Sequence, residues 1–233
     1  MIAPQTACAI IAENKGMTMK KEDVLKRIRE IGLLPVLRAR SIEEALALAE
    51  AIEAGGVTAL EVTMTVPGAI EVIRQLVRET QGRILIGAGT VLDPETARAC
   101  MMAGAEFIVS PSLNVRTIEI CRRYSVPVIP GALTPTEVVT AWEAGADVVK
   151  VFPCSALGGA KYLQALKAPL PQIELIPTGG VSLATAAEFL AAGAFALGVG
   201  GDLVNPHAIA DGKPELITQT AREYMAIIRK FRA

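Results

Sequence analysis

Short apolar runs alternate with helix-length amphipathic segments along most of this chain, and this alternation constrains the fold more than any other feature. The runs are rich in β-branched residues, as β-strands are. Strands that alternate with helices predict a parallel α/β sheet. Eight runs are expected to be strands: Leu33–Ala39, Ala59–Met64, Ile84–Thr90, Glu106–Pro111, Pro127–Ala132, Val148–Pro153, Glu174–Gly180 and Ala196–Gly201.

The intervening segments carry apolar residues three and four positions apart, which predicts crossover helices. The clearest are Ala69–Thr80, Pro94–Met102, Val115–Tyr124, Thr136–Glu143 and Leu183–Ala191. Ala-Gly turns at Gly55, Gly104, Gly145 and Gly193 are expected to end helices, because glycine adopts the left-handed conformation of a helix C-terminus. Ser41, Thr134 and Ser182 are expected to cap helix starts.

Eight strand–helix units favour a closed (β/α)8 barrel, and a chain of 233 residues with 52% hydrophobic residues suits one such domain. An open doubly wound sheet is the alternative, although no GxGxxG sequence follows the first run. We expect residues 1–19 to form a flexible tail and residues 20–233 to form the barrel, with an extra N-terminal helix.

Charge and cysteine content narrow the function classes. The net charge of −1 offers no basic field for nucleic acid or an anionic membrane. The four cysteines form no CxxC pair, His207 is the only histidine, and the apolar stretch Ala7–Ala12 lacks the basic flank of a secretory signal. We therefore expect a cytoplasmic protein with reduced thiols and without a metal or cofactor. Cys154 is interpreted as a packing residue, because no base pattern accompanies it.

Glu61 and Lys150 are expected to point into the barrel. Side chains alternate along a strand, so Glu61 shares a face with Ala59 and Thr63, and Lys150 takes the face opposite Val149 and Val151. Burying a lysine and a glutamate is costly unless they are paired. A structural ion pair is one reading. The other is chemistry, because burial favours the neutral amine, a nucleophile toward the carbonyl of a 2-keto acid.

Further polar groups are expected at the carboxyl ends of the strands, where barrels place their active sites. The substrate carboxylate needs donors, for which Arg38, Thr65, Thr90 and Thr178 are candidates, although Arg38 could equally be a solvated rim residue. Pro111, Pro130 and Phe152 are expected to line the substrate site. Backbone N–H groups after the last two strands favour a phosphate site at Gly179, Gly180, Gly200 and Gly201, unless these glycines serve only tight turns.

Several motifs, in order, resemble the 2-keto-3-deoxy-6-phosphogluconate (KDPG) and 4-hydroxy-2-oxoglutarate (KHG) aldolase family. They are Leu60-Glu61-Val62-Thr63, Gly87-Ala88-Gly89-Thr90-Val91, Ser110-Pro111, Pro130-Gly131, Thr134-Pro135-Thr136-Glu137, Lys150-Val151-Phe152-Pro153 and Thr178-Gly179-Gly180-Val181. The resemblance implies a homotrimeric class I aldolase that cleaves KDPG to pyruvate and glyceraldehyde 3-phosphate, commonly with activity on KHG. It also implies Schiff-base Lys150, acid/base Glu61 and a pyruvate contact from Thr90.

Two positions depart from the family pattern. Thr65 stands where many members have a pyruvate-binding arginine, and Gly201, followed by Asp202, stands where many have a phosphate-binding serine. An acidic group beside a phosphate weakens binding unless it points away. The alternatives are therefore an aldolase for an unphosphorylated or phosphogalactonate-type 2-keto-3-deoxy acid, a sugar-phosphate isomerase or epimerase, and a sugar-phosphate sensor without turnover.

Overall fold

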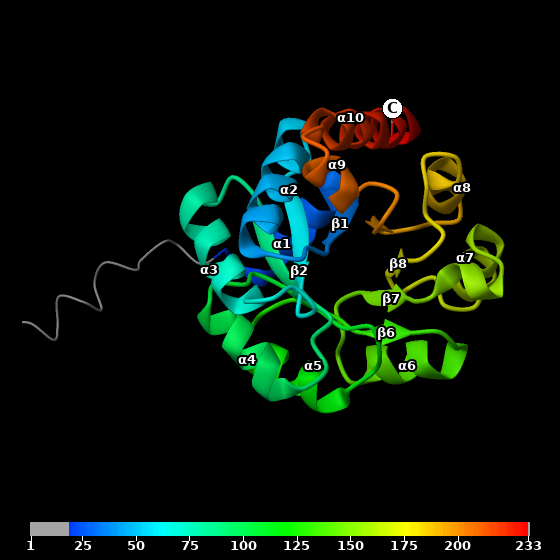
Figure 1. Cartoon of the computed structure of the whole chain (residues 1–233). Helices are drawn as coiled ribbons and strands as arrows, with labels where there is room; N and C mark the ends of the chain where they lie inside the picture. Colours follow the sequence, from blue (N-terminus) through cyan, green and yellow to red (C-terminus); the bar gives the residue numbers. More distant parts are fainter. Residues whose placement is uncertain (1–18, 233) are drawn as a thin grey trace, which may run out of the picture.

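The computed structural model describes residues 19–232, so the predicted tail falls almost entirely outside the described residues. Strands and helices alternate along the chain (Figure 1). The strands are β1 (Leu33–Leu37), β2 (Ala59–Thr63), β3 (Leu85–Gly89), β4 (Ile108–Val109), β5 (Val128–Ile129), β6 (Gly131–Ala132), β7 (Val149–Val151), β8 (Leu175–Pro177) and β9 (Leu197–Val199). The α-helices are α1 (Lys21–Ile31), α2 (Ile42–Ala54), α3 (Ala69–Thr80), α4 (Pro94–Met102), α5 (Val115–Arg123), α6 (Pro135–Glu143), α7 (Ala160–Lys167), α8 (Ala186–Ala191), α9 (Pro206–Ala210) and α10 (Pro214–Arg232), and a 3-10 turn, η1, covers Cys154–Leu157.

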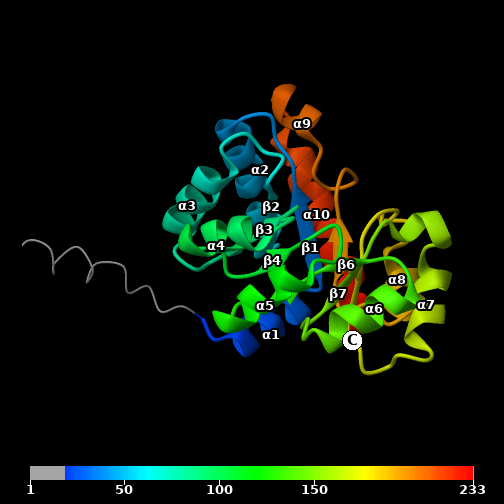
Figure 2. The same cartoon turned by 90° about the horizontal axis from the view of Figure 1, so that it is seen from below.

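The strands form a curled parallel sheet in two hydrogen-bonded parts. One has the order β5-β4-β3-β2-β1-β9 and the other the order β6-β7-β8, and every pairing is parallel. A parallel bridge from Thr178 to Gly198 joins the end of β8 to β9. The first and last strands therefore pair with each other, which contradicts the open doubly wound alternative. In both views α2, α3 and α4 lie on one side of the strands and α6, α7 and α8 on the other (Figures 1 and 2).

The predicted strand at Pro127–Ala132 is split at Pro130. Proline has no N–H to donate to a ladder, so regular pairing stops there. On one side of it β5 pairs with β4, and on the other side β6 pairs with β7. Each of the other seven predicted strands is present, with bounds shorter than the apolar run by one to four residues at its ends.

Helix starts show where the sequence patterns hold. The predicted bounds of α3 and α4 are confirmed. Ser41 accepts the N–H of Glu44, and Thr134 forms a capping box with Glu137, as predicted. The expected cap at Ser182 is wrong, because α8 begins at Ala186 after Thr185. The Thr185 hydroxyl accepts the N–H of Ser182 and donates to the Gly180 carbonyl, which holds the preceding residues in a turn.

Helix α1 lies across the amino-terminal ends of several strands. Lys21 pairs with Asp147, just before β7, at 2.6 Å, and Arg29 pairs with Glu174, just before β8. Arg27 donates to the Gly82 carbonyl, shortly before β3, at 2.9 Å. At the other end of the chain, α10 packs against α2 and α8. None of the helices in the described part of the chain is long and apolar enough to span a membrane.

Candidate active site

Lys150 and Glu61 meet inside the curled sheet. Lys150 is the middle residue of β7, and Glu61 is the middle residue of β2 on the far side of the interior. Nζ of Lys150 lies 3.2 Å from Oε1 of Glu61. The Lys150 and Glu61 side chains are 7% and 1% exposed. Their contact is therefore desolvated, as the strand alternation predicts, and each charge has its partner within hydrogen-bonding distance.

Gly89 on β3 makes room for the Glu61 carboxylate. A Cβ atom built at position 89 would lie 2.9 Å from Cδ of Glu61, which is closer than side chains approach. Gly87, two residues earlier, pairs in register with Glu61, and a Cβ there would overlap the ring of Phe107. The sequence indicated only that small residues leave space at this rim. The structure shows that Glu61 and Phe107 occupy that space.

The proline and aromatic candidates surround β7. The ring of Phe152 lies with its centroid 5.5 Å from Nζ of Lys150, at the long end of a cation–π contact. The carbonyl of Pro130 accepts the N–H of Lys150 at 2.9 Å. Gly131 pairs in register with Lys150, and a Cβ on Gly131 would overlap the backbone of Pro111. The predicted residues Pro111, Pro130 and Phe152 thus gather on the Lys150 side of the interior.

Threonines stand above both members of the pair. Thr178 lies two residues beyond Ile176, the register partner of Lys150, so it continues the inward row of β8. Its side chain is buried, and a Cβ on Gly198 would overlap its hydroxyl. On β2, the Thr63 hydroxyl donates to the Leu37 carbonyl at 3.0 Å and lies 2.7 Å from the Thr65 hydroxyl. Sequence analysis missed Thr63 as the residue that links Thr65 to β1.

Thr90 has an unusual backbone. It follows β3 with φ of 58°, in the left-handed region that a β-branched residue rarely adopts. Its side chain is half-buried at the end of the strand. Strained backbone of this kind is concentrated at binding and catalytic sites. The geometry therefore agrees with the ligand contact that the sequence assigns to Thr90.

Arg38 lies at the open end of the interior. Val36 pairs in register with Glu61, so alternation places Arg38 one step farther along the same inward row. Its side chain is exposed, and within residues 19–232 the structure gives its guanidinium no hydrogen bond or salt bridge. Arg38 is therefore not held against Lys150. In the same loop, Arg40 pairs instead with Glu44 at 2.8 Å, and this bond lowers the pKa of the Glu44 carboxyl.

The two glycine pairs predicted to bind phosphate differ from each other. Gly179 and Gly180 have φ of 89° and 79°, so their turn itself requires glycine. Gly200 and Gly201 lie outside the left-handed region, and a Cβ on either would meet open space. Turn geometry therefore does not explain the second pair. Within the described residues, none of these four glycine N–H groups has an intramolecular acceptor.

Asp202 points toward the loop after β8, contrary to the orientation that phosphate binding would favour. Its Oδ2 accepts the N–H of Leu183 at 3.3 Å and the hydroxyl of Tyr224 at 2.5 Å. Burial raises the pKa of the Tyr224 phenol, and Asp202 adds to the effect, so the hydroxyl is a donor at neutral pH. Tyr224 lies on α10, and the only sequence signal for it is a polar atom within an apolar helix stripe.

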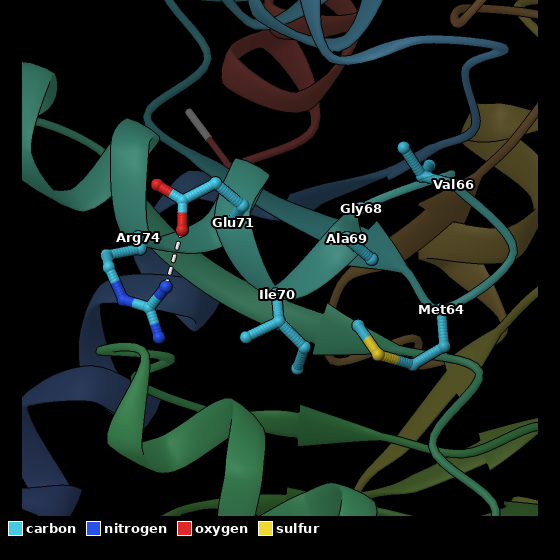
Figure 3. A pocket seen from close by; sticks show the side chains of 7 residues that line it. All are labelled: Met64, Val66, Gly68, Ala69, Ile70, Glu71 and Arg74. Atoms are coloured by element: carbon cyan, nitrogen blue, oxygen red, sulfur yellow. Dashed lines mark hydrogen bonds and ion pairs between the residues drawn. The ribbon is translucent and has the colours of Figure 1, made fainter.

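Other reactive groups stay apart from the pair. Burial raises the pKa of the Cys154 thiol to about 11, so it is protonated at neutral pH, which agrees with the packing role. Within residues 19–232 no group of three His, Cys, Asp or Glu side chains is arranged to hold a metal ion. A surface pocket beside the β2–α3 connection contains Met64, Ile70 and a Glu71–Arg74 ion pair (Figure 3). It includes none of the predicted site residues.

Comparison with known proteins identifies the family. Residues 24–220 match the family described as KDPG and KHG aldolase. The chain belongs to this aldolase family. It is 36% identical over 206 residues to the 2-dehydro-3-deoxy-phosphogluconate aldolase of Treponema pallidum, covering 88% of this chain and 96% of that protein. It is 38% identical over 192 residues to the KHG/KDPG aldolase of Escherichia coli, covering 82% and 89%.

A solved aldolase has the same fold. The structure of KDPG aldolase from Legionella pneumophila, with pyruvate captured as a covalent carbinolamine, superposes with a TM-score of 0.79. Identity is 31%, and the match covers 86% of neither chain alone but 85% of this aldolase and 96% of that one. Aldolases of this family are carbon–carbon lyases, so the present chain is one as well.

Proposed function

We propose that this aldolase forms a Schiff base between Lys150 and a 2-keto acid, and that it cleaves KDPG to pyruvate and glyceraldehyde 3-phosphate. We propose KHG, which would give pyruvate and glyoxylate, as a second substrate. The observation that carries the proposal is the buried contact of 3.2 Å between Nζ of Lys150 and Oε1 of Glu61. It joins an amine that can attack a carbonyl to a carboxylate that can move protons.

The chemistry follows from these two groups. The neutral amine of Lys150 attacks the C2 carbonyl and gives a carbinolamine, which loses water to become an iminium ion. The C3–C4 bond then breaks as a base removes the proton of the C4 hydroxyl, the aldehyde leaves, and the bonding electrons form an enamine. Protonation at C3 and addition of water release pyruvate and restore the amine. Glu61 transfers the protons, directly or through a water molecule.

The surrounding residues would hold the substrate. We assign its carboxylate to donors at the open end, namely Arg38, Thr65, Thr90 and Thr178. Pro111, Pro130 and Phe152 would line the pyruvate side, as their positions around β7 favour. The amides of Gly179, Gly180, Gly200 and Gly201 would accept a phosphate, since none of them is engaged within residues 19–232.

The architecture and assembly belong to the same proposal. The split at Pro130 and the Thr178–Gly198 bridge support one closed (β/α)8 barrel, in which β5 and β6 count as a single strand, over residues 20–233. We propose that α1 is its extra N-terminal helix. The family resemblance supports a cytoplasmic homotrimer, which light scattering on a sizing column would test.

Borohydride reduction with pyruvate is the experiment that tests the mechanism. Peptide mass spectrometry should find a reduced pyruvyl adduct on Lys150, and prior treatment with a chelator should not change its yield. Lys150→Met is the matched control and should give no adduct at that position. If the wild-type protein forms no adduct while it converts or binds a sugar phosphate, the isomerase and sensor readings replace the aldolase mechanism.

A further inference from the structure

Asp202 holds a fixed carboxylate between the two glycine loops. It follows Gly201 directly, and its Oδ2 is shared by Leu183 in the loop after β8 and by Tyr224 on α10. Tyr224 is fully buried, so its hydroxyl has a fixed direction. A carboxylate oxygen that accepts two protein donors is held more firmly than a solvated one. Asp202 thus occupies one amide of the loop that would otherwise be open to a bound anion.

The charge near these loops is unfavourable for a phosphate. From Thr178 to Val204 the sequence contains no Lys or Arg, and its only ionisable side chains are Glu188 and Asp202. Among the described residues no salt bridge neutralises Asp202. A phosphate bound by the four glycine amides would meet neutral donors and, beside Gly201, a carboxylate of like charge. Like charges a few ångströms apart repel strongly where solvent screening is weak.

We propose that Asp202 is a specificity-determining residue that disfavours a terminal phosphate on the substrate. It shifts the preference of this aldolase toward 2-keto acids whose aldehyde half ends in a hydroxyl or is too short to reach the loop after β9. This inference rests on the proposed aldolase function and refines its substrate class. KDPG stays a substrate, but its phosphate contributes less to kcat/KM than an uncharged residue at position 202 would allow.

The opposite role makes the opposite prediction. Asp202 could organise the phosphate loops by fixing the N–H of Leu183, and its removal would then weaken phosphate binding. The hydrogen bonds are the same in both cases, so the sign of the effect distinguishes them. Asparagine at position 202 keeps an oxygen acceptor for Tyr224 and Leu183 and removes only the charge.

The test compares one carbon chain with and without its phosphate. For wild type and Asp202→Asn, kcat/KM is measured on 2-keto-3-deoxygluconate and on its 6-phosphate. The ratio of phosphorylated to unphosphorylated kcat/KM should rise about tenfold in the variant, as expected for removal of one nearby like charge. Inorganic phosphate should also inhibit cleavage of the unphosphorylated substrate at lower concentration. Asp211→Asn, which removes an exposed carboxylate elsewhere, should leave the ratio as in wild type.

The outcomes separate this inference from the proposed mechanism. A ratio that falls or stays constant in Asp202→Asn overturns the specificity role. If that variant unfolds more readily, Asp202→Ser gives the same comparison with a hydroxyl in place of the charge. Failure of wild type to form the borohydride adduct on Lys150 would instead reject the aldolase mechanism. An adduct together with an unmoved ratio rejects only the role of Asp202.

Discussion

Gly89 on β3 lies so close to Glu61 on β2 that a Cβ at position 89 would be 2.9 Å from the carboxyl carbon of Glu61. The carboxylate reaches Lys150 across a surface that only a hydrogen atom leaves open. The position of the general acid/base therefore depends on the side chain that the neighbouring strand lacks.

Replacing Gly89 with alanine should impair catalysis more than stability. The added methyl meets the mobile end of Glu61, which can turn away, so we expect kcat to fall at least about tenfold with a small change in unfolding free energy. Gly87→Ala is the contrast, because its methyl would overlap the rigid ring of Phe107 and cost about 1–3 kcal/mol of stability. Kinetics and urea unfolding of both variants check this. Equal losses of stability would contradict the assignment.

Breaking the buried pair should be visible in stability as well as in turnover. Lys150→Met should abolish cleavage and lower the free energy of unfolding by about 3–5 kcal/mol, because it leaves Glu61 buried without its partner. Adding Glu61→Gln to that variant should restore part of the stability and none of the activity. A double variant no more stable than Lys150→Met would show that the pair is not coupled.

Glu61→Gln alone separates chemistry from binding. Because Glu61 is proposed to transfer protons, kcat should fall about 100-fold or more, while the binding of pyruvate changes far less. Steady-state kinetics and the yield of the borohydride adduct give the two quantities. A change confined to KM would instead make Glu61 a binding residue.

Thr90 should show a conflict between stability and activity. Its φ of 58° is strained for threonine and easy for glycine, so Thr90→Gly should leave the free energy of unfolding equal or raise it by up to about 1 kcal/mol. The same change removes the proposed pyruvate contact and should lower kcat/KM. Thermal unfolding and kinetics measure the two effects. A clear loss of stability would mean that the Thr90 side chain supports the fold.

The N-terminal cap of α4 should make stability depend on pH. Asp93 accepts the N–H of Thr96, and this bond lowers the pKa of its carboxyl. A lowered pKa means that the contribution is complete above the ordinary aspartate pKa and is lost as pH falls through the folded value. Asp93→Ala should cost about 1 kcal/mol at pH about 7, and the difference from wild type should shrink toward pH about 3. Asp93→Asn, which keeps an acceptor, is the control.

Periodicity explains what the sequence could predict. The alternation of side chains along a strand sets the direction of Glu61 and Lys150, and the spacing of apolar residues sets the bounds of α3 and α4, so both follow from local pattern. Contacts between distant segments do not. The bond between Asp202 and Tyr224 depends on where α10 docks, and the fit of Gly89 to Glu61 depends on a side-chain rotamer.

Local polar competition explains the error at Ser182. A serine before an apolar segment predicts a helix cap, but Thr185 offers a second hydroxyl three residues later, and it bonds to Ser182 and Gly180 first. The sequence contains both hydroxyls and does not rank them. The ranking depends on the turn at Gly179 and Gly180, whose conformation the packed strands determine.

Helix α1 ties together the starts of β3, β7 and β8, whereas Lys150, Glu61 and Asp202 act toward the opposite ends of the strands. The fastening of the molecule and its chemistry are thus carried by separate sets of residues. Selection can tune thermal tolerance through one set and substrate range through the other. A laboratory search for new substrates could therefore strengthen the α1 contacts first, so that later changes at the open end start from a larger margin of stability.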